Sequence, residues 1–186
     1  MYRIDPKRFT PAVAQILSKH ASYSLPLIAP GTCFDEDAKL LRDTPVASLF
    51  PNAKEPQAAV GGLLLFLGCW EQSHKVVQDV HSREGSYWHA LAHRMEPDYG
   101  NAAYWFRRVG AHPIFPKLHE AGTEVLARHA DSPLRLKSTW DPFLFIDWCE
   151  KLRPRSGDGE ERVLRQMQDA EWSLLFAWCA LNDQDS

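Results

Sequence analysis

Capping residues followed by proline divide this chain into segments that carry the start signal of an α-helix. Thr10-Pro11, Thr44-Pro45 and Asp141-Pro142 each place a side-chain oxygen directly before a proline, and each pair begins an apolar run. The oxygen can accept an unpaired N–H of the first helical turn, and proline suits the first helical position because the N–H that it lacks has no partner there. We find neither strand-type alternation nor an Asn-Gly or Asp-Gly turn between alternating runs. The sequence therefore predicts an all-α protein.

The middle of the chain is predicted to form four helices arranged as two hairpins. We expect these helices over residues 56–67, 70–80, 86–95 and 99–109. The turn of the second hairpin falls at Glu96-Pro97-Asp98, because a proline disfavours helical geometry in the residue before it and an aspartate can cap the helix that follows. Superposing Trp70 on Tyr99 relates the two hairpins by about 29 residues, which is near the period of helical-hairpin repeats.

Three further helices are predicted in the C-terminal third of the chain. They cover residues 117–129, 142–152 and 160–181, where apolar residues recur at helical intervals. Gly61-Gly62 lies within the apolar helix at 56–67, and we expect it to let neighbouring helices approach closely. A length of 186 residues is ordinary for one domain. The prediction is one helical domain, residues 1–186, built of stacked αα-hairpins.

Charge and apolar run length argue against two classes of partner. The chain has 21 basic and 24 acidic residues and a net charge of −3, so it lacks the basic field that nucleic-acid binding requires. Its longest apolar run, residues 61–69, is far shorter than the roughly 20 residues that span a bilayer. We therefore expect a soluble protein that binds neither nucleic acid nor membrane. Its partner would be another protein or a small molecule.

The cysteines predict buried thiols in a reducing compartment. Cys33, Cys69, Cys149 and Cys179 lie far apart and form no C-x-x-C pair, which argues against a zinc knuckle or a thioredoxin-type motif. The last three follow or interrupt apolar runs, as buried cysteines do. The first ten residues contain no apolar signal segment. Together these features lead us to expect a cytoplasmic protein with free thiols.

Residues 85–115 are dense in histidine, arginine, aromatic and acidic residues. They contain W-H-A-x-x-H-R-x-E-P-D followed by N-A-x-Y-W-F-R-R-V-G-x-H-P. This segment resembles one in an uncharacterised family of bacterial and fungal proteins, where a Trp-His pair, a His-Arg-x-Glu turn and the aromatic-arginine run follow in the same order. The resemblance covers residues 61–115, and its motif is long and specific. It implies no activity, because none is assigned to that family.

His89, His93 and Glu96 have the spacing of a helix-borne metal site. The two histidines are four residues apart and the glutamate follows three residues later, so two imidazoles and a carboxylate can converge on one ion. This spacing indicates a divalent metal as the cofactor. Further ligands would come from Asp98, from His112 or from the Glu71-x-x-His74 pair.

The helical wheel favours a structural role, rather than metal binding, for the same histidines. If Trp88 points to the core, His89 and His93 lie about 100–140° around the helix, on its flank or its solvent side unless another element covers them. His74 shares a face with Trp70, so we expect a partly buried, hydrogen-bonded histidine there.

A second hypothesis concerns an anion-binding pocket. Arginine binds carboxylate or phosphate through two parallel hydrogen bonds and stacks on aromatic faces. The predicted ligand-binding residues are Arg107, Arg108, His112, Tyr104, His89 and His93. The alternative for the two arginines is structural, because cations at the end of a helix favour the negative end of its dipole.

Three classes of function remain open at this point. The first is a helical interaction or scaffold module that binds a peptide or a small anionic ligand, as stacked hairpins often do. The second is a metal-dependent or small-molecule enzyme that uses residues 85–115. The third is a structural or oligomerising domain. No catalytic residue can be assigned, because the chain has no G-x-S-x-G, P-loop or dinucleotide fingerprint.

Overall fold

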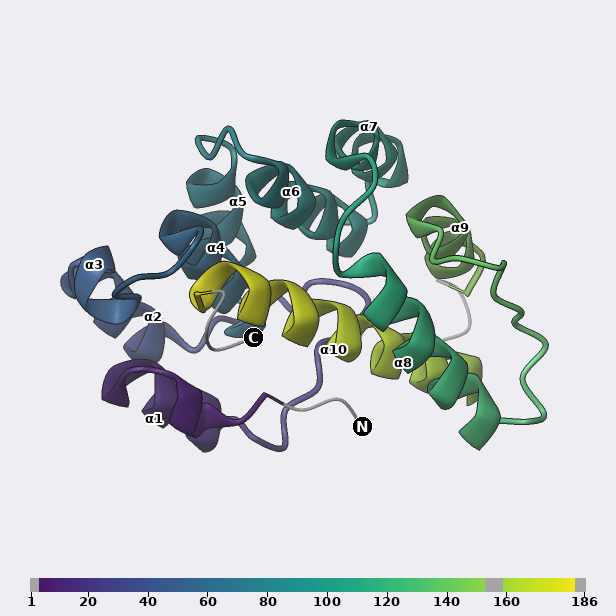
Figure 1. Cartoon of the computed structure of the whole chain (residues 1–186), viewed down its shortest axis with the longest axis horizontal. Helices are drawn as coiled ribbons and strands as arrows, with labels where there is room; N and C mark the ends of the chain where they lie inside the picture. The colour runs from purple at the N-terminus through teal and green to yellow at the C-terminus, as the bar shows by residue number, and fades with distance from the viewer. Residues whose placement is uncertain (1–3, 153–158, 183–186) are drawn as a thin grey trace.

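The computed structural model describes residues 4–152 and 159–182, and in these ranges the chain consists of helices and loops (Figure 1). Helices account for 66% of the described residues, and none of these residues forms a strand. The elements are η1 (Pro6–Arg8), α1 (Pro11–Lys19), α2 (Asp35–Asp43), α3 (Val46–Leu49), α4 (Pro56–Phe66), α5 (Trp70–Val77), α6 (Arg83–Met95), α7 (Tyr99–Val109), α8 (Phe115–Arg128), α9 (Pro142–Leu152) and α10 (Gly159–Ala180). The predicted all-α fold is confirmed.

Helices α4, α6 and α10 form the centre of the molecule. The long α10 crosses the middle of the view, with α8 beside it and with α6 and α7 above it (Figure 1). α4 packs against both α6 and α10, and α5 and α7 pack against the outer sides of α4 and α6. The two predicted hairpins, α4 with α5 and α6 with α7, are therefore both present and stacked.

The Gly61-Gly62 pair lets three helices meet at α4. A Cβ added at Gly62 would lie 2.4 Å from the ring of Trp88 on α6, and one at Gly61 would lie 2.2 Å from Val77 on α5. The carbonyl of Gly62 also accepts a 2.8 Å hydrogen bond from the indole N–H of Trp172 on α10. The close approach predicted for this pair is present, and it lets both α5 and α6 pack closely on α4.

A buried ion pair joins α6 to α10. Arg94 contacts the carboxylate of Glu171, and both side chains are fully buried. The hydroxyl of Tyr87 donates a 2.9 Å hydrogen bond to the same carboxylate, and Arg94 also donates to Gln168. Breaking one partner of such a pair leaves an uncompensated buried charge, so this contact strongly resists separation of α6 from α10.

Helix boundaries follow the side chains that cap them. Asp98 accepts a 3.1 Å hydrogen bond from the backbone of Asn101, and Gly110 ends α7 with a φ of 61°, both as predicted. α6 begins three residues earlier than expected, because the hydroxyl of Ser82 accepts from the backbone N–H of Gly85. Gly85 therefore lies within the first turn of α6 rather than before it.

Of the three pairs of capping residue and proline, one forms the predicted cap. The carboxylate of Asp141 accepts from the backbone N–H groups of Phe143 and Leu144. The hydroxyl of Thr10 instead donates a 2.9 Å hydrogen bond to the carbonyl of Leu49, so it ties α1 to α3. The third prediction was wrong in register, since Pro45 precedes α3 and no side chain caps that helix.

The expectation of free thiols was wrong for two of the four cysteines. Cys33 and Cys69 form a disulfide with a Cα–Cα distance of 4.5 Å. It joins the loop before α2 to the turn between α4 and α5, two segments that no local sequence signal brings together. Cys149 and Cys179 are free and buried, as predicted, and burial raises the pKa of the Cys149 thiol to about 12. With a disulfide present, the cysteines no longer favour a reducing compartment.

No helix in the described parts of the chain is both long enough and apolar enough to cross a bilayer.

Candidate metal centre

Three histidines from two helices converge on one point. The Nε2 atom of His74, on α5, lies 2.9 Å from Nε2 of His89 and 3.4 Å from Nε2 of His93, both on α6. One ring nitrogen from each residue lies within 4.8 Å of the other two. We call these three residues the histidine cluster.

The packing of α5 on α6 builds this cluster. His89 and His93 are one helical turn apart, and their rings stack with centroids 4.8 Å apart at 14°. His74 meets both rings edge-on, at 85° and 84°. Trp70, one turn before His74, stacks on its ring and donates a 2.8 Å hydrogen bond to the carbonyl of Ala92. This bond holds α5 against α6 beside the cluster.

The helical wheel placed His89 and His93 on the flank or the solvent side of α6 unless another element covered them, and two neighbouring helices do cover them. Their exposed fractions are only 5% and 9%. The wheel treats one helix face as core, whereas every residue from Gly85 to Met95 is buried. α5 covers the two histidines on one side, and the ring of Trp105 on α7 stacks on His89 with centroids 4.0 Å apart.

The two Nε2–Nε2 distances from His74 are close to the nitrogen spacing in the ligand shell of a zinc ion. Tetrahedral zinc with Zn–N bonds of about 2.05 Å separates its ligand nitrogens by about 3.3 Å. The two Nε2–Nε2 distances from His74 are 2.9 and 3.4 Å, so an ion fits between the rings with shifts of a few tenths of an ångström. Each of these Nε2 atoms can act as a metal ligand when it carries no proton.

Both electrostatics and burial favour the neutral imidazoles that a metal requires. Burial and, to a smaller extent, the neighbouring His74 and His93 lower the pKa of His89 to about 4. Burial and His93 likewise lower the pKa of His74. A histidine binds a metal through a deprotonated ring nitrogen, so these two residues are in the ligand form at neutral pH.

Glu96, a predicted metal ligand, lies at the opposite ring nitrogen of His93. Its Oε2 atom is 3.1 Å from Nδ1 of His93, whereas Nε2 of His93 faces His74. A carboxylate in this position fixes the tautomer, because it accepts the Nδ1 proton and leaves the Nε2 lone pair free. Asp98 lies near both residues but uses its two oxygens to cap α7 through Asn101.

Without a cation, no arrangement of the ring protons gives every ring nitrogen of the cluster a hydrogen-bond partner. With the Nδ1 proton of His93 directed at Glu96, its Nε2 atom carries a lone pair. His74 has one Nε2 position to offer to two neighbours, so a proton there serves His89 or His93 but not both fully. The Nδ1 atom of His89 is buried and has no hydrogen-bond partner. Such an arrangement is typical of a binding site rather than of a structural network.

Of the other predicted ligand-binding residues, Tyr104 and Arg108 contact Trp105, whose ring stacks on His89. Arg107 and His112 lie against other side chains. The guanidinium of Arg108 lies 5.2 Å from the Trp105 ring, whereas that of Arg107 lies 5.9 Å from the ring of Phe143 on α9. Tyr104 is 49% exposed. His112 is buried elsewhere, with its Nε2 atom 3.4 Å from the carboxylate of Glu84.

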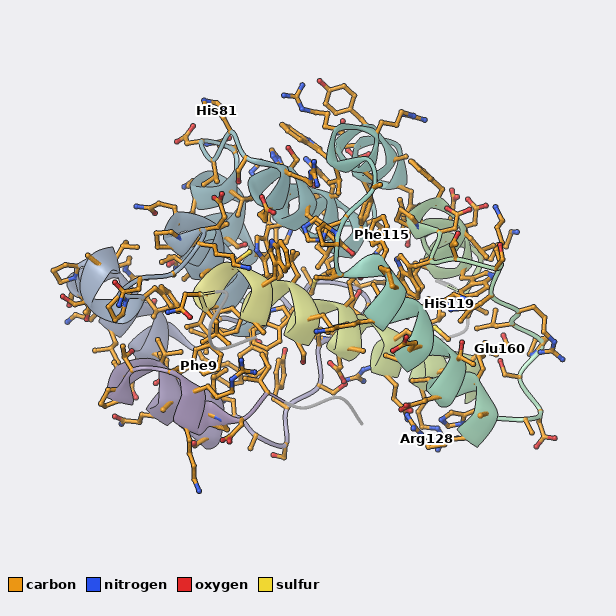
Figure 2. All side chains as sticks on the ribbon, viewed as in Figure 1. Phe9, His81, Phe115, His119, Arg128 and Glu160 are labelled. Atoms are coloured by element: carbon orange, nitrogen blue, oxygen red, sulfur yellow. A yellow bond between two sulfur atoms is a disulfide. The ribbon has the colours of Figure 1, made fainter. Side chains whose placement is uncertain are left out.

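Of the eight histidines in the chain, the sequence singled out two members of the cluster and gave His74 a secondary role. His81 and His119 lie apart from it, on the α5–α6 connection and on α8 (Figure 2). The signal for His74 was its position on the face of α5 that carries Trp70. Because α5 and α6 are joined by a short turn, that face must pack on α6.

No protein-family model, curated protein or solved structure matches this chain.

Proposed function

We propose that this chain is a metal-binding protein whose histidine cluster holds one divalent transition-metal ion, with zinc as the best fit. The convergence of one ring nitrogen from each of three histidines, all within 4.8 Å of one another, carries this proposal. Imidazole nitrogen suits zinc, copper, nickel and iron, whereas magnesium and calcium prefer oxygen ligands. The 2.9 and 3.4 Å distances from His74 are close to the nitrogen spacing of tetrahedral zinc, which favours zinc among the first group.

The test is a metal titration of the purified chain after treatment with a chelator. Calorimetry with Zn²⁺ should show one ion bound per chain. His74→Ala, His89→Ala and His93→Ala should each weaken binding at least tenfold, because each removes one of three ligands. His81→Ala is the matched control, since His81 is an exposed histidine on the neighbouring turn, and it should bind as the natural chain does. Absence of stoichiometric binding, or equal binding by all four variants, would rule out the cluster as the metal site.

A peptide- or anion-binding helical module is the second candidate function. The observation that favours it is an exposed aromatic-arginine surface on α7 and α9, where Tyr104 and Phe143 are 49% and 38% exposed and Arg107 lies over Phe143. Exposed aromatics beside arginine are enriched at binding surfaces. Titration with inorganic phosphate, followed by NMR, should then show saturable shifts that Arg107→Ala abolishes. Shifts that persist in this variant would exclude the surface.

A further inference from the structure

A cavity of about 230 Å³ lies between the N-terminal part of the chain and α10, and it shares no residue with the histidine cluster. Its walls come from η1, α1, the loop after α1, the end of α4 and one face of α10. Leu25, Phe66 and Trp172, which line it, are buried, whereas Ala21 and Ser22 in the loop after α1 are exposed. The cavity therefore has a buried interior and an edge that reaches solvent.

Aromatic rings form much of the cavity wall. Phe66 and Trp172 stack with ring centroids 4.6 Å apart, and Tyr23 meets Phe66 edge-on at 5.6 Å. The indole N–H of Trp172 donates to the carbonyl of Gly62, which fixes the orientation of its ring. Such rings pack well against a flat aromatic ligand. The cavity is somewhat smaller than the roughly 300–1,000 Å³ of most ligand pockets, so it suits a single substituted ring.

The ionisable groups at the cavity have partners within the protein. The carboxylate of Asp169 accepts a 2.6 Å hydrogen bond from the hydroxyl of Ser24 and a 2.8 Å bond from the backbone N–H of Leu25. The Nε2 atom of His20 lies 2.8 Å from the carboxylate of Asp37. Burial of a further charge that lacks a dedicated partner is unfavourable. These contacts favour an uncharged ligand.

Two hydroxyl groups at the cavity can serve such a ligand. Ser173 and Tyr23 both line it, and neither hydroxyl has a hydrogen-bond partner among the residues that the structure describes. Ser173 is only 6% exposed. Burial raises the pKa of Tyr23, so its hydroxyl stays a neutral donor at physiological pH. Buried polar groups in native proteins normally have a partner, and a ligand in the cavity would supply one.

We propose that this cavity binds a small, uncharged aromatic compound that carries a hydroxyl group, of the phenol class. The ring of the ligand packs against Phe66 and Trp172, and its hydroxyl bonds to Ser173 and Tyr23. This site is separate from the metal centre, and neither site depends on the other.

The experiment is an NMR titration of the full chain with phenol and, separately, with toluene. Phenol should cause saturable shifts in residues 20–25 and 169–173, with a Kd of about 1 mM or below for so small a ligand. The double variant Tyr23→Phe/Ser173→Ala keeps the aromatic wall but removes both hydroxyls. It should bind phenol about fivefold more weakly, the effect of losing one hydrogen bond, and should bind toluene as the natural chain does.

Two controls accompany this titration. Ser18→Ala changes an exposed serine of α1 that does not line the cavity, so it should bind phenol as the natural chain does. Toluene binding by the double variant shows that its cavity is intact, and Ser173→Ala alone, a milder change, replaces it if the double variant does not fold. A chelator should change none of these results, because the cavity contains no residue of the histidine cluster.

The proposal is overturned if phenol at several millimolar gives no saturable shifts, or if the shifts map to another part of the chain. Equal phenol affinities in the natural chain and the folded hydroxyl-free variant would also overturn it, since the hydroxyls would then recognise nothing. Failure of the zinc titration leaves this proposal unaffected.

Discussion

The folded chain keeps His89 neutral at pH values where an ordinary histidine is protonated, and this makes the folded state less stable at low pH. Burial lowers its pKa to about 4 in the folded chain, against 6.5 for an unperturbed histidine. As the pH falls below 6.5, His89 becomes protonated in the unfolded chain but stays neutral in the folded chain. The free energy of unfolding of the metal-free protein therefore decreases between pH 6.5 and 4.

We expect His89 to contribute about 2 kcal/mol of this loss between pH 7 and pH 5. The measurement is urea denaturation at both pH values with a chelator present. His89→Gln keeps a polar side chain of similar size but does not titrate, so the difference between the two pH values should shrink by about that amount. An unchanged difference would mean that His89 is protonated in the folded chain at pH 5.

Glu96 should influence the metal without binding it. Replacing a carboxylate that orients a ligand histidine typically lowers metal affinity by 10- to 100-fold. We therefore expect Glu96→Gln to weaken Zn²⁺ binding by this factor while keeping a stoichiometry of one. Asp98→Asn is the control, because Asp98 lies on the same turn but caps α7. Unchanged Zn²⁺ affinity in Glu96→Gln would show that the Glu96 carboxylate does not orient His93 for the metal.

The residues of the site could be predicted from the sequence only in part. The i, i+4 spacing of His89 and His93 indicated a pair of ligands, and the same reasoning attached Glu96 to them. Their burial could not be predicted, because the wheel of a single helix contains no information about α5 and α7. The third ligand, His74, lies on another helix, so its role depended on how two helices pack.

At the scale of elements, the disulfide Cys33–Cys69 fixes the start of α5. Cys69 is the residue directly before Trp70, whose indole holds α5 on α6. A second contact joins the same segments, since the backbone N–H of Phe34 donates a 3.0 Å hydrogen bond to the carbonyl of Leu67. The loop before α2 therefore supports the turn that leads into the histidine cluster.

Loss of this disulfide should lower the free energy of unfolding by about 3–4 kcal/mol. The two cysteines are 36 residues apart, and the chain entropy of the unfolded state rises by that amount when a loop of this length is opened. Thermal denaturation of Cys33→Ser should match that of the natural chain in the presence of a reductant. Alkylation of the unreduced, denatured chain should modify two of its four cysteines. Modification of all four would show that no disulfide forms.

Helices were more predictable than their contacts. The cap at Asp98, the stop at Gly110 and the cap at Asp141 all depend on residues adjacent in sequence, and the structure confirms them. Thr10 has the same local signal, yet its hydroxyl bonds to Leu49, which lies 39 residues away. The disulfide and the Arg94–Glu171 pair are likewise long-range, so no periodicity or spacing could predict them.

At the scale of the whole molecule, the histidine cluster lies across the boundary between the two stacked hairpins. His74 belongs to the α4–α5 hairpin, and His89 and His93 belong to the α6–α7 hairpin. A metal ion bound by all three residues would add a link between hairpins that side-chain packing, the Trp70–Ala92 hydrogen bond and the residues between α5 and α6 already join. Binding energy at the centre would then become folding energy for both hairpins.

An ion bound in this position would couple the opening of α5 to the opening of α6. At a free Zn²⁺ concentration of 100 times the Kd, the folded state gains about 2.7 kcal/mol. Hydrogen exchange followed by mass spectrometry should show slower exchange in α5 and α6 together, and by the same factor, when Zn²⁺ is added. In His74→Ala the two helices should exchange at different rates with or without the metal. The three histidines would then link the two hairpins whenever metal is bound, and the concentration of free metal would set how often the hairpins separate.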